Sequence, residues 1–148
     1  NDNTVGQLVV SGEIQYLETF AEILKKKNIK FTKLQVSAPF HCPLMKNATE
    51  KMKSIINDTN FNDPVVSVIS NVNAEPQNKK NDIKKLLIDQ IEKPVRWRES
   101  IEYMIGSGVN RFVEVGPGKI LSGLVKRIDR NVELNQVNNL LDLKILND

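Results

Sequence analysis

The sequence predicts a mixed α/β protein in which an α+β unit precedes an α/β layer. Between residues 7 and 72, short β-branched runs alternate with amphipathic helical segments, in the order strand, helix, strand, loop, helix, strand. After residue 81, a buried strand leads into a glycine-rich turn and then a helix, an order typical of a parallel sheet. We therefore expect a boundary between the two patterns in the polar, turn-rich segment 73–81.

The element order of the first unit is typical of a ferredoxin-like fold. A helix is predicted from Glu13 to Asn28, because apolar side chains recur at helical spacing before three lysines. A second helix follows Pro43 and continues to about Ile56. The alternation of apolar and polar residues from Phe31 to Ser37 indicates a strand with one buried face. The other strands are expected at 7–11 and 65–72, with a short fourth one within 38–42.

The second unit is predicted to place helices around one buried strand, Arg111 to Val115. The helices are expected at 82–91, 97–107 and 119–128. The sequence Gly116-Pro117-Gly118 forms a tight turn between the strand and the last of these helices. The tail from Val132 is expected to hold a further strand and a short helix. Because residues 82–148 are too few to close a doubly wound sheet, we expect an α/β domain that lacks some of its strands.

Composition places the chain among globular proteins and narrows the possible partners. Its 148 residues are 40% apolar and 26% charged, and the formal net charge is +3. This charge is small for a nucleic-acid-binding protein, and the basic runs lack interleaved aromatic residues, so we expect no nucleic-acid partner. No apolar run approaches the roughly 20 residues needed to cross a bilayer, and the polar start does not resemble a signal peptide. We expect no membrane partner and a cytoplasmic location, or a plastid in a plastid-bearing host.

Cysteine and histidine are scarce, which limits the chemistry. One cysteine, Cys42, excludes a disulfide framework within the chain. With one cysteine and one histidine, the chain does not supply the ligands of a zinc site of the usual spacing. A site made only of carboxylates stays possible, but the sequence holds no D-x-D-x-D-G loop. We expect no metal site, and we also expect no cofactor.

His41 is the leading candidate for chemistry. It is the only imidazole, and it lies between Pro39 and Pro43 in a segment that neither a helix nor a central strand tolerates, so we expect a stiff loop. A neutral imidazole is the usual general base near neutral pH. The alternative is a histidine that only satisfies a structural hydrogen bond. Cys42 is interpreted as a packed side chain rather than a nucleophile paired with His41, because adjacent side chains usually point apart.

Two further motifs are interpreted as structural. Ser107 lies between two glycines, but the spacing is one residue short of a G-x-S-x-G nucleophile elbow. If His41 is a base, its nucleophile is therefore expected outside this chain. The segment 116–119 presents a helix N-terminus that could favour an anion. It nevertheless fails the Walker A and dinucleotide-binding patterns, because of Val113, Ile120 and Leu121.

Five stretches carry a family resemblance when they are taken together: 3–12, 36–45, 70–72, 93–97 and 113–119. In order and spacing they resemble the C-terminal half of malonyl-CoA:acyl carrier protein transacylases. The resemblance implies a large α/β-hydrolase-like acyltransferase subdomain with a small ferredoxin-like subdomain inserted in it. Residues 4–72 would form most of the insert. Residues 73–148 would form the C-terminal portion of the large subdomain, whose N-terminal portion with the nucleophile elbow is absent.

The resemblance also implies a reaction. In this family a malonyl group passes from malonyl-CoA to a serine, and then to the phosphopantetheine thiol of acyl carrier protein, in fatty acid biosynthesis. At the matching positions, His41 would be the general base, held by a backbone carbonyl near Gln90 where other hydrolases use an aspartate. On the substrate side, Phe40 would favour malonyl over branched acyl groups, and Asn3 would lie near the pocket.

The chain also departs from the family pattern. The serine elbow, the oxyanion-hole glutamine and the arginine that pairs with the malonyl carboxylate are not in this chain, and Val5 stands where the family usually has proline. We therefore expect this chain alone to be inactive. The alternative is a non-catalytic module, in which a ferredoxin-like domain over 4–72 uses its basic helices to bind an acidic partner protein.

Overall fold

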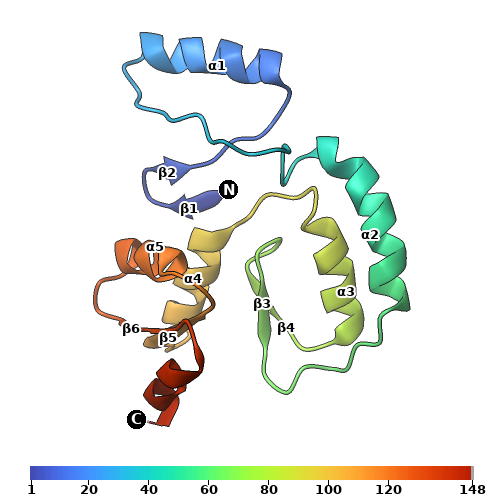
Figure 1. Ribbon diagram of the computed structural model, residues 1–148, viewed down its shortest axis with the longest axis vertical. Helices are drawn as coiled ribbons and strands as arrows, with labels where there is room; N and C mark the ends of the chain where they lie inside the picture. The colour runs from blue at the N-terminus through green and yellow to red at the C-terminus, as the bar shows by residue number, and fades with distance from the viewer. Residues whose placement is uncertain (148) are drawn as a thin grey trace.

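Three separate two-stranded sheets carry the strands in residues 1–147, the part of the chain that the computed structural model describes. Helices lie beside and between these sheets, so the prediction of a mixed helix and sheet protein is confirmed (Figure 1). The described residues therefore build no continuous sheet of four strands. Each sheet is formed by strands that are near one another in sequence.

The first sheet is a short antiparallel hairpin of β1 (Asp2–Thr4) and β2 (Gln7–Leu8), so the strand predicted at 7–11 is shorter than expected. Helix α1 (Ile14–Lys26) follows, as predicted. It ends where Asn28 adopts a left-handed conformation with φ of +56°. Figure 1 shows α1 standing apart from the other helices, and none of its side chains is buried.

The strands predicted at 31–37 and 38–42 are wrong. Residues 29–36 have no regular secondary structure, and turns occupy the segment after them. The side chains that were expected to face a core are exposed, by 43% for Phe31, 53% for Leu34 and 62% for Val36. A strand with one buried face needs a neighbouring strand to bind its amides and a layer to cover its apolar side chains. Among the described residues, no strand pairs with this segment.

The middle of the chain forms two helices and a hairpin. A 3-10 turn, Pro43–Met45, leads into α2 (Lys46–Asp58), and α3 (Lys80–Asp89) packs against α2. Between these helices in sequence, β3 (Val68–Ser70) pairs antiparallel with β4 (Glu75–Gln77), and Figure 1 shows α3 between this hairpin and α2.

The strand predicted at 65–72 is therefore too long, and β4 lies within the segment that was expected to be a boundary. The chain reverses after Ser70, where Ala74 adopts a left-handed φ of +58° and its amide donates to the Ser70 carbonyl. This tight reversal ends β3 early and brings the next residues back beside it.

The last third of the chain follows the prediction closely. Its helices are α4 (Trp97–Gly106) and α5 (Ile120–Ile128), and its strands are β5 (Arg111–Val115) and β6 (Glu133–Val137). The two strands pair in parallel, with Arg111 opposite Glu133 and Val115 opposite Val137. A 3-10 helix, Leu140–Asn147, follows where a short helix was expected. The main core lies where α4, α5 and this sheet meet, and its buried apolar side chains are those of Ile101, Leu124, Val125 and Val137.

Candidate active site

The loop that carries His41 is held in an unusual backbone conformation. His41 has a φ of +60°, in the left-handed region that residues with a Cβ rarely adopt. Two local hydrogen bonds fix the loop: the Cys42 thiol donates to the Pro39 carbonyl at 3.1 Å, and the Met45 amide donates to the Cys42 carbonyl at 3.0 Å. The prediction of a constrained loop is confirmed, and the thiol of Cys42 supports that loop.

The imidazole of His41 contacts the end of α3. Its Nδ1 lies 2.8 Å from the backbone carbonyl oxygen of Gln90, and both residues are partly buried. Because a carbonyl oxygen only accepts hydrogen bonds, the proton in this contact lies on Nδ1. In a neutral ring, Nε2 is then left with its lone pair, which is the state needed to accept a proton. The structure thus brings together His41 and the carbonyl that the resemblance placed near Gln90, whereas the catalytic role of His41 stays a prediction.

The side chain of Gln90 bonds to the connection that follows α3. Its Nε2 atom lies 3.0 Å from the carbonyl oxygen of Lys93 and 3.3 Å from that of Pro94, and it donates to both. The residue therefore contributes twice to this region: its carbonyl accepts from His41, and its carboxamide closes the turn of the chain between α3 and α4.

The same connection binds two other parts of the chain. The carbonyl of Val95 accepts from the Asp2 amide of β1 at 2.8 Å. The amide of Arg96 donates to the Asn71 carbonyl, in the turn after β3, at 2.9 Å. Segment 90–96 therefore joins β1 and the β3–β4 turn by backbone hydrogen bonds, and it joins the His41 loop through the His41 side chain. Three segments that are far apart in sequence are fixed around one connection.

The two other predicted site residues lie on different elements. Phe40 precedes His41 on the same loop and is 48% exposed. Asn3 is on β1, a half-buried position, and its strand reaches the connection through its neighbour Asp2. The structure therefore brings His41 and Gln90 into contact, and it relates Asn3 to them only through the shared connection.

Sequence reasoning missed the ion pairs that secure this arrangement. The Arg98 guanidinium on α4 donates to the Asp2 carboxylate, with an Nη2 to Oδ2 distance of 2.7 Å. The hydrogen bonds that the guanidinium donates to the Asp2 and Glu102 carboxylates raise the pKa of Arg98. The partners Asp2 and Arg98 are separated by 96 positions, so no local pattern indicates this pair. Arg96 directly precedes the same helix, and its guanidinium lowers the pKa of Glu99 through a direct hydrogen bond.

A carboxylate of the protein itself lies at the start of α5, the helix that follows the glycine-rich turn. The Glu114 carboxylate accepts hydrogen bonds from the amides of Leu121 and Ser122, at 3.0 and 2.8 Å, and from the Ser122 hydroxyl at 2.6 Å. The Gly118 amide donates to the Asn138 side chain. Burial acts to raise the pKa of Glu114, but the hydrogen bonds from Ser122 and its neighbours outweigh it, and the pKa is lowered. The structural interpretation of this motif is supported, because a protein carboxylate already caps α5.

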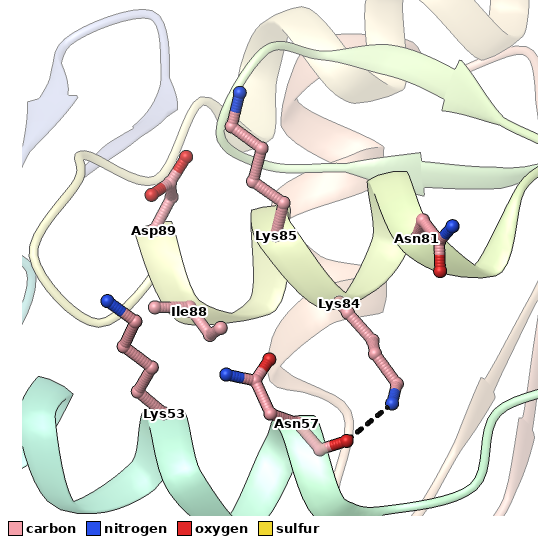
Figure 2. A pocket seen from close by; sticks show the side chains of 7 residues that line it. All are labelled: Lys53, Asn57, Asn81, Lys84, Lys85, Ile88 and Asp89. Atoms are coloured by element: carbon pink, nitrogen blue, oxygen red, sulfur yellow. Dashed lines mark hydrogen bonds between the residues drawn. The ribbon is translucent and has the colours of Figure 1, made fainter.

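A hollow between α2 and α3 is lined mainly by polar side chains (Figure 2). One of its lysines, Lys84, takes part in packing. The Lys84 ammonium donates to the Asn57 carbonyl at 2.9 Å, drawn as a dashed line in Figure 2, and it lies 5.1 Å from the centre of the Phe61 ring. These contacts tie α3 to the end of α2. The lining residues are Lys53, Asn57, Asn81, Lys84, Lys85, Ile88 and Asp89.

Residues 1–147 contain no group of three or more histidine, cysteine, aspartate or glutamate side chains arranged to bind a metal ion. Within that range, no helix has the length and apolar character needed to cross a membrane.

Comparison with known proteins agrees with the resemblance seen in the sequence. A malonyl CoA-acyl carrier protein transacylase of Bacillus subtilis is 46% identical over 134 residues, which are 90% of this chain and 42% of the relative. An acyl-carrier-protein-S-malonyltransferase of Bartonella henselae has the same fold over 93% of this chain and 45% of its own, with a TM-score of 0.85 and 37% identity. The chain is a relative of the malonyl CoA-acyl carrier protein transacylases.

The match extends over nearly all of this chain but not over all of the relatives. The chain spans about half the length of the curated transacylases it matches, which agrees with the expected half of the enzyme. A solved complex of a type II PKS acyl-carrier protein with its malonyl-transacylase also matches, at 32% identity and a TM-score of 0.83 over 93% of this chain. No protein-family model matches the chain.

Proposed function

We propose that this chain is the histidine-bearing half of a malonyl-CoA:acyl carrier protein transacylase. The observation that carries the proposal is the 2.8 Å contact between His41 Nδ1 and the Gln90 carbonyl, in a chain related to transacylases over nearly its whole length. A backbone carbonyl then does for His41 what a buried aspartate does in a Ser-His-Asp triad: it fixes the ring and its tautomer. The serine belongs to polypeptide that is not in this chain.

His41 would move the proton in both halves of the reaction. In the first, Nε2 takes the proton of the serine hydroxyl, and the serine oxygen attacks the thioester carbonyl of malonyl-CoA. The bond to sulfur breaks, and the leaving coenzyme A thiolate takes the proton from the imidazolium. In the second half, the phosphopantetheine thiol gives its proton to His41 and attacks the malonyl ester. The serine oxygen then leaves and recovers the proton.

The substrate-side residues complete the proposal. Phe40 is adjacent to His41, and its large exposed ring would restrict the acyl group next to the base. Asn3 would line the same pocket from β1. Acyl carrier protein is the proposed acceptor, since a related transacylase has been solved in complex with such a carrier. We propose a cytoplasmic location and no bound cofactor, with malonyl-CoA as the donor substrate.

The finer architecture also belongs to this proposal. Residues 4–72 would form most of a ferredoxin-like insert, and residues 73–148 the end of an α/β-hydrolase-like subdomain. A parallel pair such as β5 and β6 is usually part of a larger sheet that is covered on both faces. The missing half would supply further strands and cover exposed side chains such as Val115, Ile120 and Leu121. The non-catalytic module is not favoured, because the matching relatives are transacylases.

A chimera tests the proposal. This chain replaces the matching part of the Bacillus subtilis transacylase, and the product is incubated with labelled malonyl-CoA and a carrier protein. We expect covalent malonyl on the chimera, followed by its transfer to the carrier. The isolated chain is the control and should acquire no covalent label. A folded chimera that neither acquires nor transfers malonyl, or labelling of the isolated chain, would contradict the proposal.

A further inference from the structure

We propose that the side chain of Gln90 is a positioning residue for His41. Its carboxamide holds the turn after α3 in the shape that directs the carbonyl of the same residue at Nδ1 of the imidazole. As a statement about catalysis, the inference rests on the proposed function. As a statement about the tautomer of His41, it is tested without any measurement of activity.

The sequence explains why the Gln90 carbonyl is available. Gln90 follows α3 with helical dihedral angles, φ −61° and ψ −22°, and its amide donates to the Leu86 carbonyl at 2.9 Å. In a continuing helix, the carbonyl of residue 90 would accept from the amide of residue 94. Residue 94 is proline, which has no amide hydrogen. The helix therefore leaves this carbonyl without an internal donor, and His41 provides one at 2.8 Å.

The carboxamide fixes the direction of that carbonyl. Nε2 of Gln90 has two hydrogens, and it donates to the Lys93 carbonyl at 3.0 Å and to the Pro94 carbonyl at 3.3 Å. The amides of Glu92 and Lys93 also donate to the Asp89 carbonyl, at 3.1 and 2.8 Å, so the turn keeps backbone bonds when the carboxamide is removed. We therefore expect substitution of Gln90 to loosen the carbonyl rather than unfold the turn.

The conformation of the His41 loop explains why the Gln90 carbonyl must keep its direction. The left-handed φ of +60° leaves the loop little freedom to follow a carbonyl that moves. A neutral imidazole that loses its partner at Nδ1 can carry its proton on Nε2 instead. In that tautomer Nε2 no longer accepts a proton, and the ring is not a base at the position where the serine is expected.

Nitrogen NMR of the imidazole measures the tautomer directly. The chimera described above is assembled with only this chain's segment labelled with ¹⁵N. Because His41 is the only histidine of the chain, it then gives the only labelled imidazole. The unsubstituted protein is expected to hold mainly the Nδ1–H tautomer. In Gln90→Met, which keeps the length but has no donor, the ratio of Nδ1–H to Nε2–H should fall on the order of fivefold, the effect of losing about one hydrogen bond.

Gln77→Met is the matched control. Gln77 lies on β4, and its Nε2 also donates to a backbone carbonyl, that of Glu75, at 3.1 Å. It loses the same kind of bond at another place, so its His41 tautomer ratio should not change. Gln90→Glu is a second variant of nearly the same shape, and its ionised carboxylate has no hydrogen to donate. It should lower the ratio as well.

The outcomes separate this inference from the proposed function. An unchanged tautomer ratio in folded Gln90→Met overturns the inference, whatever the transfer rate. Loss of the folded amide spectrum in both Gln90 variants also overturns it, because Gln90 would then be a residue required for folding. A changed ratio with a kcat lowered on the order of fivefold and an unchanged KM for malonyl-CoA supports both claims. A changed ratio with unchanged transfer supports the Gln90 inference and contradicts His41 as the base.

Discussion

The two ends of the chain contain similar helices in different surroundings. Helix α1 near the start and helix α4 in the last third are both amphipathic, and both lie within two residues of the predicted bounds at their C-terminal ends. Helix α4 contacts α5 and β1 and buries Ser100 and Ile101, whereas α1 buries no side chain. The strand segments differ in the same way: β5 pairs with β6, and residues 29–36 pair with no strand among the described residues.

This contrast shows which interactions are local. An α-helix satisfies most of its backbone hydrogen bonds within one segment, so its sequence pattern is sufficient to predict it. A strand depends on another strand for its hydrogen bonds and on another layer for burial. In the last third, the strand that pairs with β5, which is β6, and the helix that packs against this sheet, which is α5, are both close in sequence. The alternating pattern from Phe31 to Ser37 requires partners that residues 1–147 do not place beside it.

Equivalent truncations in the two helices give the largest expected difference in stability. Ile101 on α4 is 1% exposed, and Ile101→Ala should lower the free energy of unfolding by about 2–5 kcal/mol, because it leaves a cavity in the core. Ile23 on α1 is 44% exposed, and Ile23→Ala should lower it by less than about 1 kcal/mol. Urea unfolding of both variants measures the difference. Equal losses would show that the two helices are packed alike.

The carboxylate that caps α5 should give a smaller effect that depends on pH. Glu114→Gln removes the charge but keeps one acceptor, and we expect a loss of about 1–2 kcal/mol near neutral pH. The folded pKa of Glu114 is lowered, so its contribution is complete above the unfolded pKa of about 4.3 and is lost as the pH falls through the folded pKa.

Unfolding curves of the unsubstituted chain and of Glu114→Gln, measured from neutral to acidic pH, test whether this stabilisation is lost as the pH falls. The difference between them should shrink below the ordinary glutamate pKa. A difference that stays constant down to strongly acidic pH would show that the charge of Glu114 does not stabilise α5.

Ion pairs in the two regions should have the smallest effects on stability. The pair that involves α4 should again contribute more than the pair on α1. Arg98 on α4 reaches Asp2 on β1, with side chains 31% and 25% exposed. Lys25 and Glu22 pair along α1, with side chains 61% and 62% exposed. Double-mutant cycles on the two pairs should give a clearly larger coupling for Asp2 and Arg98, since solvent screens the exposed pair more strongly. Equal couplings would mean that Arg98 does not hold the first hairpin to α4.

Sequence reasoning was most successful where structure depends on local pattern or on one motif. It predicted β5 at its observed bounds, the glycine-rich turn after it, and the constrained loop around His41. The resemblance also placed a carbonyl near Gln90. Pro94, four residues later, has no amide hydrogen, which explains why that carbonyl is available to His41. The pair Asp2 and Arg98 and the early end of β3 were not predicted. Both depend on contacts or backbone reversals that no periodic pattern encodes.

The role of His41 as the general base is tested most directly by the first half of the reaction, measured in the chimera and in its His41→Ala variant. His41→Ala should lower the rate of malonyl transfer by ~10²–10⁴, because a general base is lost. Cys42→Ser keeps a donor for the Pro39 carbonyl next to the same histidine, and it should retain most of the rate. A His41→Ala chimera that transfers malonyl as fast as the unsubstituted one would contradict the assignment of the base to this chain.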